Sequence, residues 1–129
     1  MTSSQFREEI AASPIIAAVK DGNGLQKSLS SDARVIFVLY GTVCSIAEIV
    51  RAIKATGRIA VVHLDLIAGL SNSKEVSVDF IRENTQADGI ISPRQPLIRR
   101  GKEVGLFTIQ RFFLLDSMAL ESVKRLREG

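Results

Sequence analysis

Polar side chains follow five short apolar runs of this chain, at the point where each run ends. They supply cations, an imidazole, carboxylates, a hydroxyl and an amide. This mixture suits a small polyol or sugar phosphate, because Lys or Arg can pair with a phosphate while Asp, His and Gln bond hydroxyl groups. The polar ends are Lys20-Asp21, Tyr40-Gly41, His63 with Asp65, Ser92, and Gln110-Arg111.

His63 is the only histidine of the chain, so any catalysis by an imidazole must use it. An unperturbed pKa of about 6.5 suits proton transfer, but a structural hydrogen bond or a contact with a ligand would also explain the residue. Asp65 can position a sugar hydroxyl or cap the loop that follows it. Arg111 lies between apolar Ile109 and Phe112. Because an unpaired guanidinium inside a core is costly, we expect an anion or a buried carboxylate beside it.

A helical pattern follows each apolar run, which is typical of strand-loop-helix units with strands buried on both faces. The expected strands cover residues 15–19, 35–39, 59–64, 88–91 and 106–109. If these strands are parallel, their carboxyl ends meet at one edge of the sheet and gather the polar ends there. The sequence therefore predicts an α/β fold with one polar rim.

Local signals predict some details of the connections. Gly22-Asn23-Gly24 is interpreted as a flexible turn, and Ser45 with Glu48 has the spacing of a capping box at a helix start. The loop of residues 66–73 is the longest, and such loops commonly carry function. A last helix is expected to start near residues 116–117.

Composition indicates one globular domain over residues 1–129, with 46% hydrophobic and 24% charged residues. The apolar runs are far shorter than the roughly 20 residues that span a bilayer, and acidic residues precede any apolar stretch, so we expect a cytoplasmic protein without membrane contact. Cys44 has no second cysteine for an internal disulfide. Metal-ligand spacings and the two common phosphate-binding glycine motifs are missing, so no metal and no cofactor is expected.

Basic residues are concentrated in the last third of the chain. Residues 1–92 hold nine Lys/Arg and ten Asp/Glu, whereas residues 93–129 hold eight and four, so the excess of +4 lies at the C-terminal end. Such a cluster can attract a polyanion such as RNA, or it can be a solvated helix face. The candidate RNA-binding residues are Arg94, Arg99, Arg100, Lys102, Lys124, Arg125 and Arg127.

Four stretches together resemble the glycerol-3-phosphate responsive antiterminators of the glycerol uptake operon. They cover residues 14–20, 61–70, 87–92 and 110–117. The resemblance implies a (β/α)8 barrel of the TIM type that senses glycerol 3-phosphate and binds the leader mRNA of a glycerol catabolic operon, without turnover. It also implies a set of ligand-binding positions at the rim, namely Lys20, His63, Asp65, Ser92 and Arg111.

The chain departs from this family at its C-terminus. Family members continue for roughly three more strand-helix units, so we expect a barrel truncated after about five units. The phosphate is expected near the loops after strands 7 and 8, which this chain lacks. Five parallel strands leave two open edges, which predicts a homo-oligomer or another assembly that completes the sheet.

Three functional hypotheses follow from these patterns. The first is a metabolite-gated, RNA-binding regulator. The second is a barrel enzyme that acts on a small phosphorylated polyol or sugar, with His63 or Asp65 as the acid or base. The third is a remnant that has neither function.

Overall fold

The computed structural model describes residues 15–111, in which strands and helices alternate along the chain. The sheet has five strands in the order β1-β2-β3-β4-β5, and every neighbouring pair is parallel. This confirms the predicted α/β fold. The strands are β1 (Ile16–Val19), β2 (Val35–Val38), β3 (Ile59–His63), β4 (Gly89–Ser92) and β5 (Phe107–Gln110).

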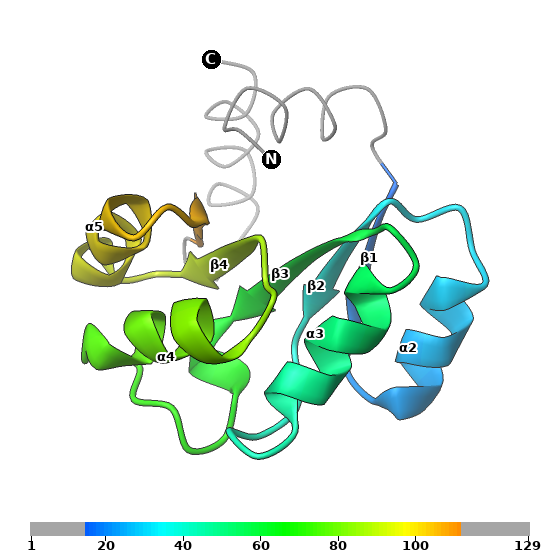
Figure 1. Ribbon diagram of the computed structural model, residues 1–129, viewed down its shortest axis with the longest axis horizontal. Helices are drawn as coiled ribbons and strands as arrows, with labels where there is room; N and C mark the ends of the chain where they lie inside the picture. Colours follow the sequence, from blue (N-terminus) through cyan, green and yellow to red (C-terminus); the bar gives the residue numbers. More distant parts are fainter. Residues whose placement is uncertain (1–14, 112–129) are drawn as a thin grey trace, which may run out of the picture.

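The helices connect each strand to its immediate neighbour in the sheet. They are α2 (Gly22–Leu29), α3 (Ile46–Lys54), α4 (Val76–Asn84) and α5 (Gln95–Glu103), with a short 3-10 turn η1 (Leu64–Leu66) after β3. Because βαβ crossovers are right-handed, an unreversed strand order places all connecting helices on one face. Figure 1 shows this arrangement for α2, α3 and α4. An order without reversal is consistent with a segment of a (β/α)8 barrel, whereas a doubly wound sheet reverses its order.

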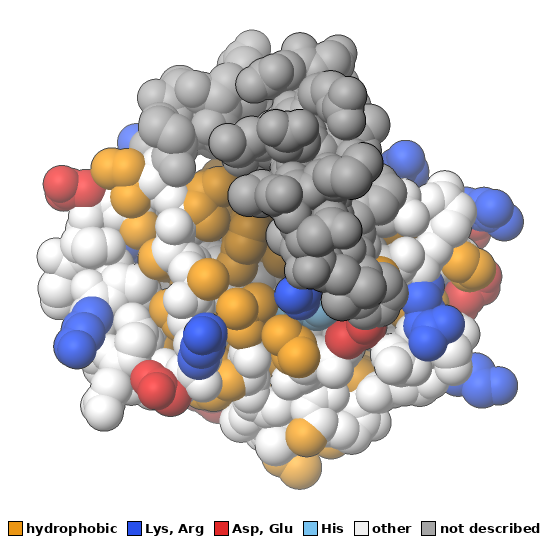
Figure 2. Space-filling model, turned by 180° about the vertical axis from the view of Figure 1, so that it is seen from behind, with side chains coloured by type: hydrophobic (Ala, Val, Ile, Leu, Met, Phe, Trp, Pro, Cys, Tyr) orange, Lys and Arg blue, Asp and Glu red, His pale blue; other side chains and the backbone are white. Residues whose placement is uncertain are grey.

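Side-chain alternation along the strands produces two apolar clusters. The larger cluster joins one set of strand residues to the buried faces of the helices and includes Val62, Ile90 and Leu97. The smaller cluster contains only strand residues, so it lies on the face away from the helices. Its buried members are Val35, Ile59, Val61 and Ile91, with Ile16, Phe37, Phe107 and Ile109 packed against them. Figure 2 shows apolar side chains gathered on this face.

Of two local predictions at helix starts, the one for residues 22–24 is wrong, while the one for Ser45 is right about where α3 begins but not about the capping bond. The glycines of residues 22–24 form the first turn of α2, because the carboxylate of Asp21 accepts the N–H of Gly24 at 2.7 Å and caps the helix. Ser45 precedes α3 but makes no capping bond to it. Its hydroxyl instead accepts the N–H of Thr42 at 2.9 Å, so a competing local hydrogen bond replaces the capping box.

Gly101 allows α5 to pack closely on the sheet. A Cβ at this position would lie 2.8 Å from Cγ2 of Thr108 and 2.9 Å from Cδ1 of Ile90. We expect Gly101→Ala to lower the free energy of unfolding by about 1–2 kcal/mol, because the clash outweighs the better helix propensity of alanine. Urea denaturation measures this change. Gly22→Ala is the matched control, since no heavy atom lies within 4 Å of its Cβ position, and an equal loss there would contradict the packing argument.

Candidate functional site

The carboxyl ends of the five strands lie along one edge of the sheet, as the parallel pairing requires. This edge carries the predicted polar residues in chain order, with Lys20 after β1, His63 at the end of β3, Ser92 at the end of β4, and Arg111 after β5. Lys20 is exposed and lies two strands away from His63. The predicted polar residues therefore lie along the same edge, but the side chains of neighbouring residues can point to opposite faces of the sheet.

His63 and Arg111 meet on the face away from the helices. Val61 and Ile109, two residues earlier on β3 and β5, belong to the cluster on that face. The alternation carries His63 and Arg111 to the same side, where Nη1 of Arg111 lies 2.8 Å from Nε2 of His63. The sequence predicted an anion or a carboxylate beside Arg111. The structure instead places an imidazole against this guanidinium, which is itself exposed.

Ser92 lies on the opposite side of the sheet. Ile90, two residues earlier, packs in the cluster beneath the helices, and Ser92 is fully buried. Its hydroxyl accepts the N–H of Arg94 at 3.1 Å and so shapes the entry into α5. Ser92 therefore supports the β4-α5 connection, and the structure does not place it beside the His63–Arg111 pair.

The imidazole of His63 is only 3% exposed, and its pKa is lowered from the ordinary value near 6.5. Burial is the main cause, because it disfavours the charged form. The neighbouring guanidinium of Arg111 lowers the pKa further, while the carboxylate of Asp65 and, to a smaller extent, the backbone of His63 itself raise it. The folded protein therefore favours a neutral imidazole.

This lowered pKa makes folding stability depend on pH. Because the unfolded chain binds a proton near pH 6.5 and the folded chain binds it only at lower pH, stability is full above about pH 6.5 and falls as the pH drops toward the folded pKa. We expect the urea midpoint to decrease between about pH 7 and pH 5. In His63→Gln this slope should be smaller than in the unchanged chain, and an identical slope in both would contradict the assignment.

Asp65 lies in η1, at the start of the long loop after β3. This loop is tied to the β2-α3 loop, because Ala68 donates its N–H to Gly41 O and accepts the N–H of Val43, both at 2.9 Å. Gly69 adopts a positive φ of 95° beside Val43, a conformation that favours glycine. Asp65 is thus carried on an anchored loop, and its Oδ1 is buried without a hydrogen-bond partner.

A cavity of about 600 Å³ opens between the β3-α4 and β4-α5 loops. This volume lies within the usual range of small-molecule sites, about 300–1,000 Å³. Its wall combines the carboxylate of Asp65 with the guanidinium of Arg94 and the amide of Asn72. The lining residues are Asp65, Asn72, Ser73, Pro93, Arg94, Pro96 and Leu97. The sequence indicated a role for the loop of residues 66–73 through its length, but it did not single out Asn72 or Ser73. It placed Arg94 among the candidate RNA-binding residues.

Other rim residues have local roles. The carboxylate of Asp21 caps α2, and burial together with this carboxylate raises the pKa of Tyr40. Nε2 of Gln110 donates a long hydrogen bond of 3.4 Å to Pro93 O. Cys44 is exposed on the β2-α3 loop.

The basic residues predicted to bind RNA differ in exposure and in whether an ion pair already engages them. Arg94, Arg99 and Lys102 are exposed. Arg100 is engaged, because its guanidinium pairs with Asp79 and with Glu103, each at 2.9 Å. The candidates Lys124, Arg125 and Arg127 lie outside the described residues, as does the expected last helix.

Two further features concern residues 15–111. No group of three or more His, Cys, Asp or Glu side chains there could hold a metal ion. None of the helices described in this range is long and apolar enough to cross a membrane.

Comparison with known proteins decides the family. The family model described as glycerol-3-phosphate responsive antiterminator matches residues 15–128. The chain belongs to this antiterminator family. The family is regulatory, which confirms the expectation of a non-enzyme and counts against the barrel-enzyme hypothesis.

Relatives of this antiterminator family include a curated sequence and two solved structures. The Escherichia coli K12 protein YgcP, described as uncharacterized, is 42% identical over 112 residues, which cover 87% of this chain and 58% of YgcP. The glycerol uptake operon antiterminator regulatory protein of Listeria monocytogenes has a TM-score of 0.73 at 30% identity, over 88% of this chain and 60% of its own. A glycerol uptake operon antiterminator-related protein of Thermotoga maritima has a TM-score of 0.68 at 27% identity, over 88% and 63%. The chain thus spans less than two thirds of each relative.

Proposed function

We propose that this chain is a glycerol-3-phosphate-responsive antiterminator that acts in the cytoplasm on the leader mRNA of a glycerol catabolic operon. The observation that carries the proposal is the cavity at the carboxyl edge of the sheet, where Asp65 and Arg94 stand in one wall. A carboxylate suits the hydroxyl groups of a polyol, and a guanidinium suits its phosphate. The family match supplies the identity of the metabolite.

His63 and Arg111 extend this ligand site on the neighbouring part of the sheet edge. In the proposal His63 and Asp65 meet the hydroxyl end of glycerol 3-phosphate, and Arg94 meets the phosphate. Lys20 and Ser92 remain proposed ligand residues of the family rim. Lys20 follows β1, two strands away from β3, whereas Ser92 is buried and holds the N–H of Arg94.

Isothermal titration with glycerol 3-phosphate tests the metabolite half of the proposal. We expect saturable binding by this chain and weaker binding of n-propyl phosphate, which lacks the hydroxyl groups proposed to meet Asp65. A version extended by three strand-helix units serves as the comparison. Binding by neither form would overturn the proposal, while binding only by the extended form would place the phosphate beyond Gly129.

Filter binding with the leader transcript tests the RNA half. Phosphate contacts release counterions, so the affinity should fall steeply with salt, by a slope of about −0.7 to −0.9 per contact in a log-log plot. Exposed Arg99 and Lys102 are the described residues best placed for this role, because Arg100 is held by two carboxylates. Glycerol 3-phosphate should raise the affinity for RNA. Binding that is indifferent to both salt and metabolite would refute this half.

We also propose that the chain assembles with itself. Within the described residues, the strand order ends at β1 and at β5, and edge strands of a sheet favour pairing with another chain. Light scattering should give a mass of at least twice 14.1 kDa. A monodisperse monomer would contradict the proposal.

A further inference from the structure

The contact between Arg111 and His63 determines where the imidazole carries its proton. A guanidinium has only donors and stays charged in proteins. Because Nη1 of Arg111 lies 2.8 Å from Nε2 of His63, this ring nitrogen must be the acceptor. A neutral imidazole that accepts at Nε2 carries its hydrogen at Nδ1. His63 therefore presents an Nδ1–H donor.

Two buried polar atoms have no hydrogen-bond partner within residues 15–111, and they are complementary. One is Nδ1 of His63, and the other is Oδ1 of Asp65. The first is a donor by the argument above, and the second is a carboxylate oxygen, which accepts hydrogen bonds. The two side chains are electrostatically coupled, since the carboxylate of Asp65 affects the titration of His63, yet no hydrogen bond joins them. A buried donor and acceptor left unpaired are costly, so a bound group that satisfies both would be favoured.

An O–H group is the simple chemical group that fits this pair, and a water molecule that occupies the position in the free protein would be displaced by a hydroxyl group of the ligand. Its oxygen can accept from Nδ1–H while its hydrogen is donated to Oδ1. A phosphate oxygen would accept from Nδ1–H but would be repelled by the carboxylate. An ammonium group would pair with the carboxylate but offers no acceptor for Nδ1–H. The location agrees with this reading, because Asp65 also lines the cavity.

We propose that Nδ1–H of His63 and Oδ1 of Asp65 together bind one hydroxyl group of the ligand, and that Arg111 is a positioning residue that fixes the tautomer of His63. This inference rests on the proposed function for the presence of a polyol phosphate. In this proposal Arg111 orients His63 and does not bind the phosphate. The phosphate is left to Arg94, which lines the same cavity as Asp65.

Nuclear magnetic resonance of the intact chain tests the tautomer directly, because a single histidine gives a single imidazole in the spectrum. Two-bond ¹H–¹⁵N correlations at pH 7.5 should show the Nδ1-protonated form. Arg111→Met should give a mixture of tautomers and a higher imidazole pKa, and Arg111→Lys should restore the single form. Arg99→Met is the control and should change nothing. An Nε2-protonated or charged imidazole in the unchanged chain would overturn the inference without any ligand.

A second experiment tests the ligand with two anions, glycerol 3-phosphate and n-propyl phosphate, which differ only in their hydroxyl groups. Glycerol 3-phosphate should shift the Nδ1–H resonance and slow its exchange with water, whereas n-propyl phosphate should leave it unchanged. Asp65→Asn should weaken glycerol 3-phosphate at least tenfold with no effect on n-propyl phosphate. Tight binding of glycerol 3-phosphate without a response at Nδ1 would refute this inference and leave the proposed function intact. A response to free glycerol, without binding of glycerol 3-phosphate, would support the hydroxyl site and refute the proposed function.

Discussion

Asp88→Ala is expected to lower the free energy of unfolding by about 3 kcal/mol or more. The carboxylate of Asp88 is 14% exposed and accepts two bonds, from Nζ of Lys54 at 2.8 Å and from the backbone N–H of Ala60 at 2.9 Å. Removing it leaves the buried N–H of Ala60 without its acceptor, and it leaves the partly buried ammonium of Lys54 without its anionic partner, with only Arg58 O at 3.2 Å. Such a loss is among the costly changes a single substitution can make.

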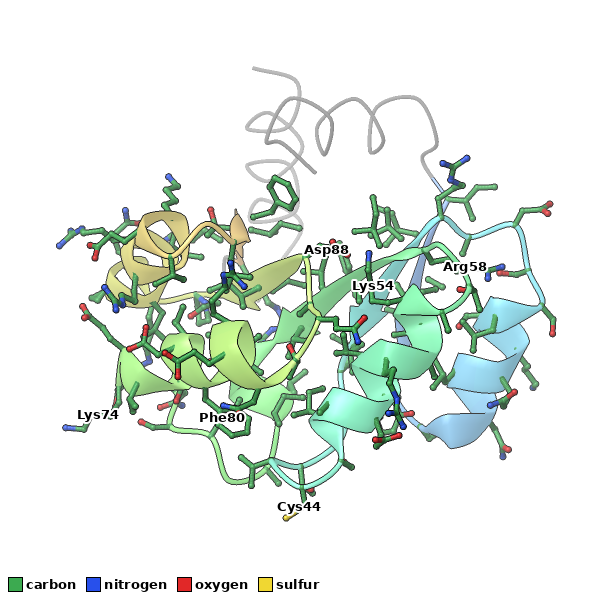
Figure 3. All side chains as sticks on the ribbon, viewed as in Figure 1. Cys44, Lys54, Arg58, Lys74, Phe80 and Asp88 are labelled. Atoms are coloured by element: carbon green, nitrogen blue, oxygen red, sulfur yellow. The ribbon has the colours of Figure 1, made fainter. Side chains whose placement is uncertain are left out.

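The position of Asp88 in the sheet adds to this effect. Its own N–H donates to Ala60 O at 2.9 Å, and its carbonyl accepts the N–H of Phe107 at 3.0 Å, so the residue joins β3, β4 and β5. Figure 3 shows Lys54 and Asp88 directed toward each other, at the end of the sheet opposite Cys44. Changes here should therefore affect stability without touching the ligand site.

Urea denaturation of three variants checks this prediction. Asp88→Asn keeps an acceptor for Ala60 and should lose less than Asp88→Ala. Glu48→Ala is the control, because its ion pair with Arg51 is exposed, with 68% of the Glu48 side chain accessible, and such pairs contribute about 0–1 kcal/mol. A loss at Asp88 no larger than that at Glu48 would show that the buried carboxylate does not stabilise the sheet.

Arg94→Ala is expected to lower the affinity for glycerol 3-phosphate by about 10- to 100-fold, since charge-assisted hydrogen bonds contribute about 1.5–3 kcal/mol. Arg94 stands in the wall of the cavity, and the Arg94 N–H is fixed by Ser92. Arg99, five residues later, is exposed on α5 and does not line the cavity. The two residues therefore separate the proposed metabolite site from the proposed RNA surface.

Calorimetry and filter binding on both variants should show opposite effects on metabolite binding and RNA binding. Arg94→Ala should lose metabolite affinity and keep the salt slope of RNA binding, measured without metabolite. Arg99→Ala should keep metabolite affinity and reduce that slope by about one. If Arg94→Ala instead lowers the slope and leaves metabolite binding unchanged, Arg94 belongs to the RNA surface, as the sequence alone had suggested.

Figure 2 places basic, imidazole and acidic side chains close together at the margin of the apolar sheet face. Apolar and ionic groups are therefore adjacent at the carboxyl edge. An assembly that covered the apolar face would also lower the access of water to this edge, which would strengthen the charge-assisted contacts proposed for the ligand.

The sequence by itself determined the order and type of the elements. Apolar runs bounded by polar residues predicted five strands, and each observed strand lies within about one residue of its predicted bounds. Parallel strands put their carboxyl ends at one edge whatever the details of packing, so the location of the polar rim followed from the same pattern. Predictions from local signals were less secure, as the glycines in the first turn of α2 and the missing capping bond of Ser45 illustrate, because neighbouring groups redirected the hydrogen bonds.

Only the tertiary structure decided which rim residues face each other. His63 and Arg111 are 48 residues apart and come from strands that are not neighbours, so their contact depends on the register of three strands. Side chains along a strand alternate between the two faces of the sheet, so a register shift of one residue would turn His63 or Arg111 to the other face. Ser92, at the end of β4, faces that other side. The cavity that joins Asp65 to Arg94 likewise depends on how two loops pack, which no pattern of residue types along the chain encodes.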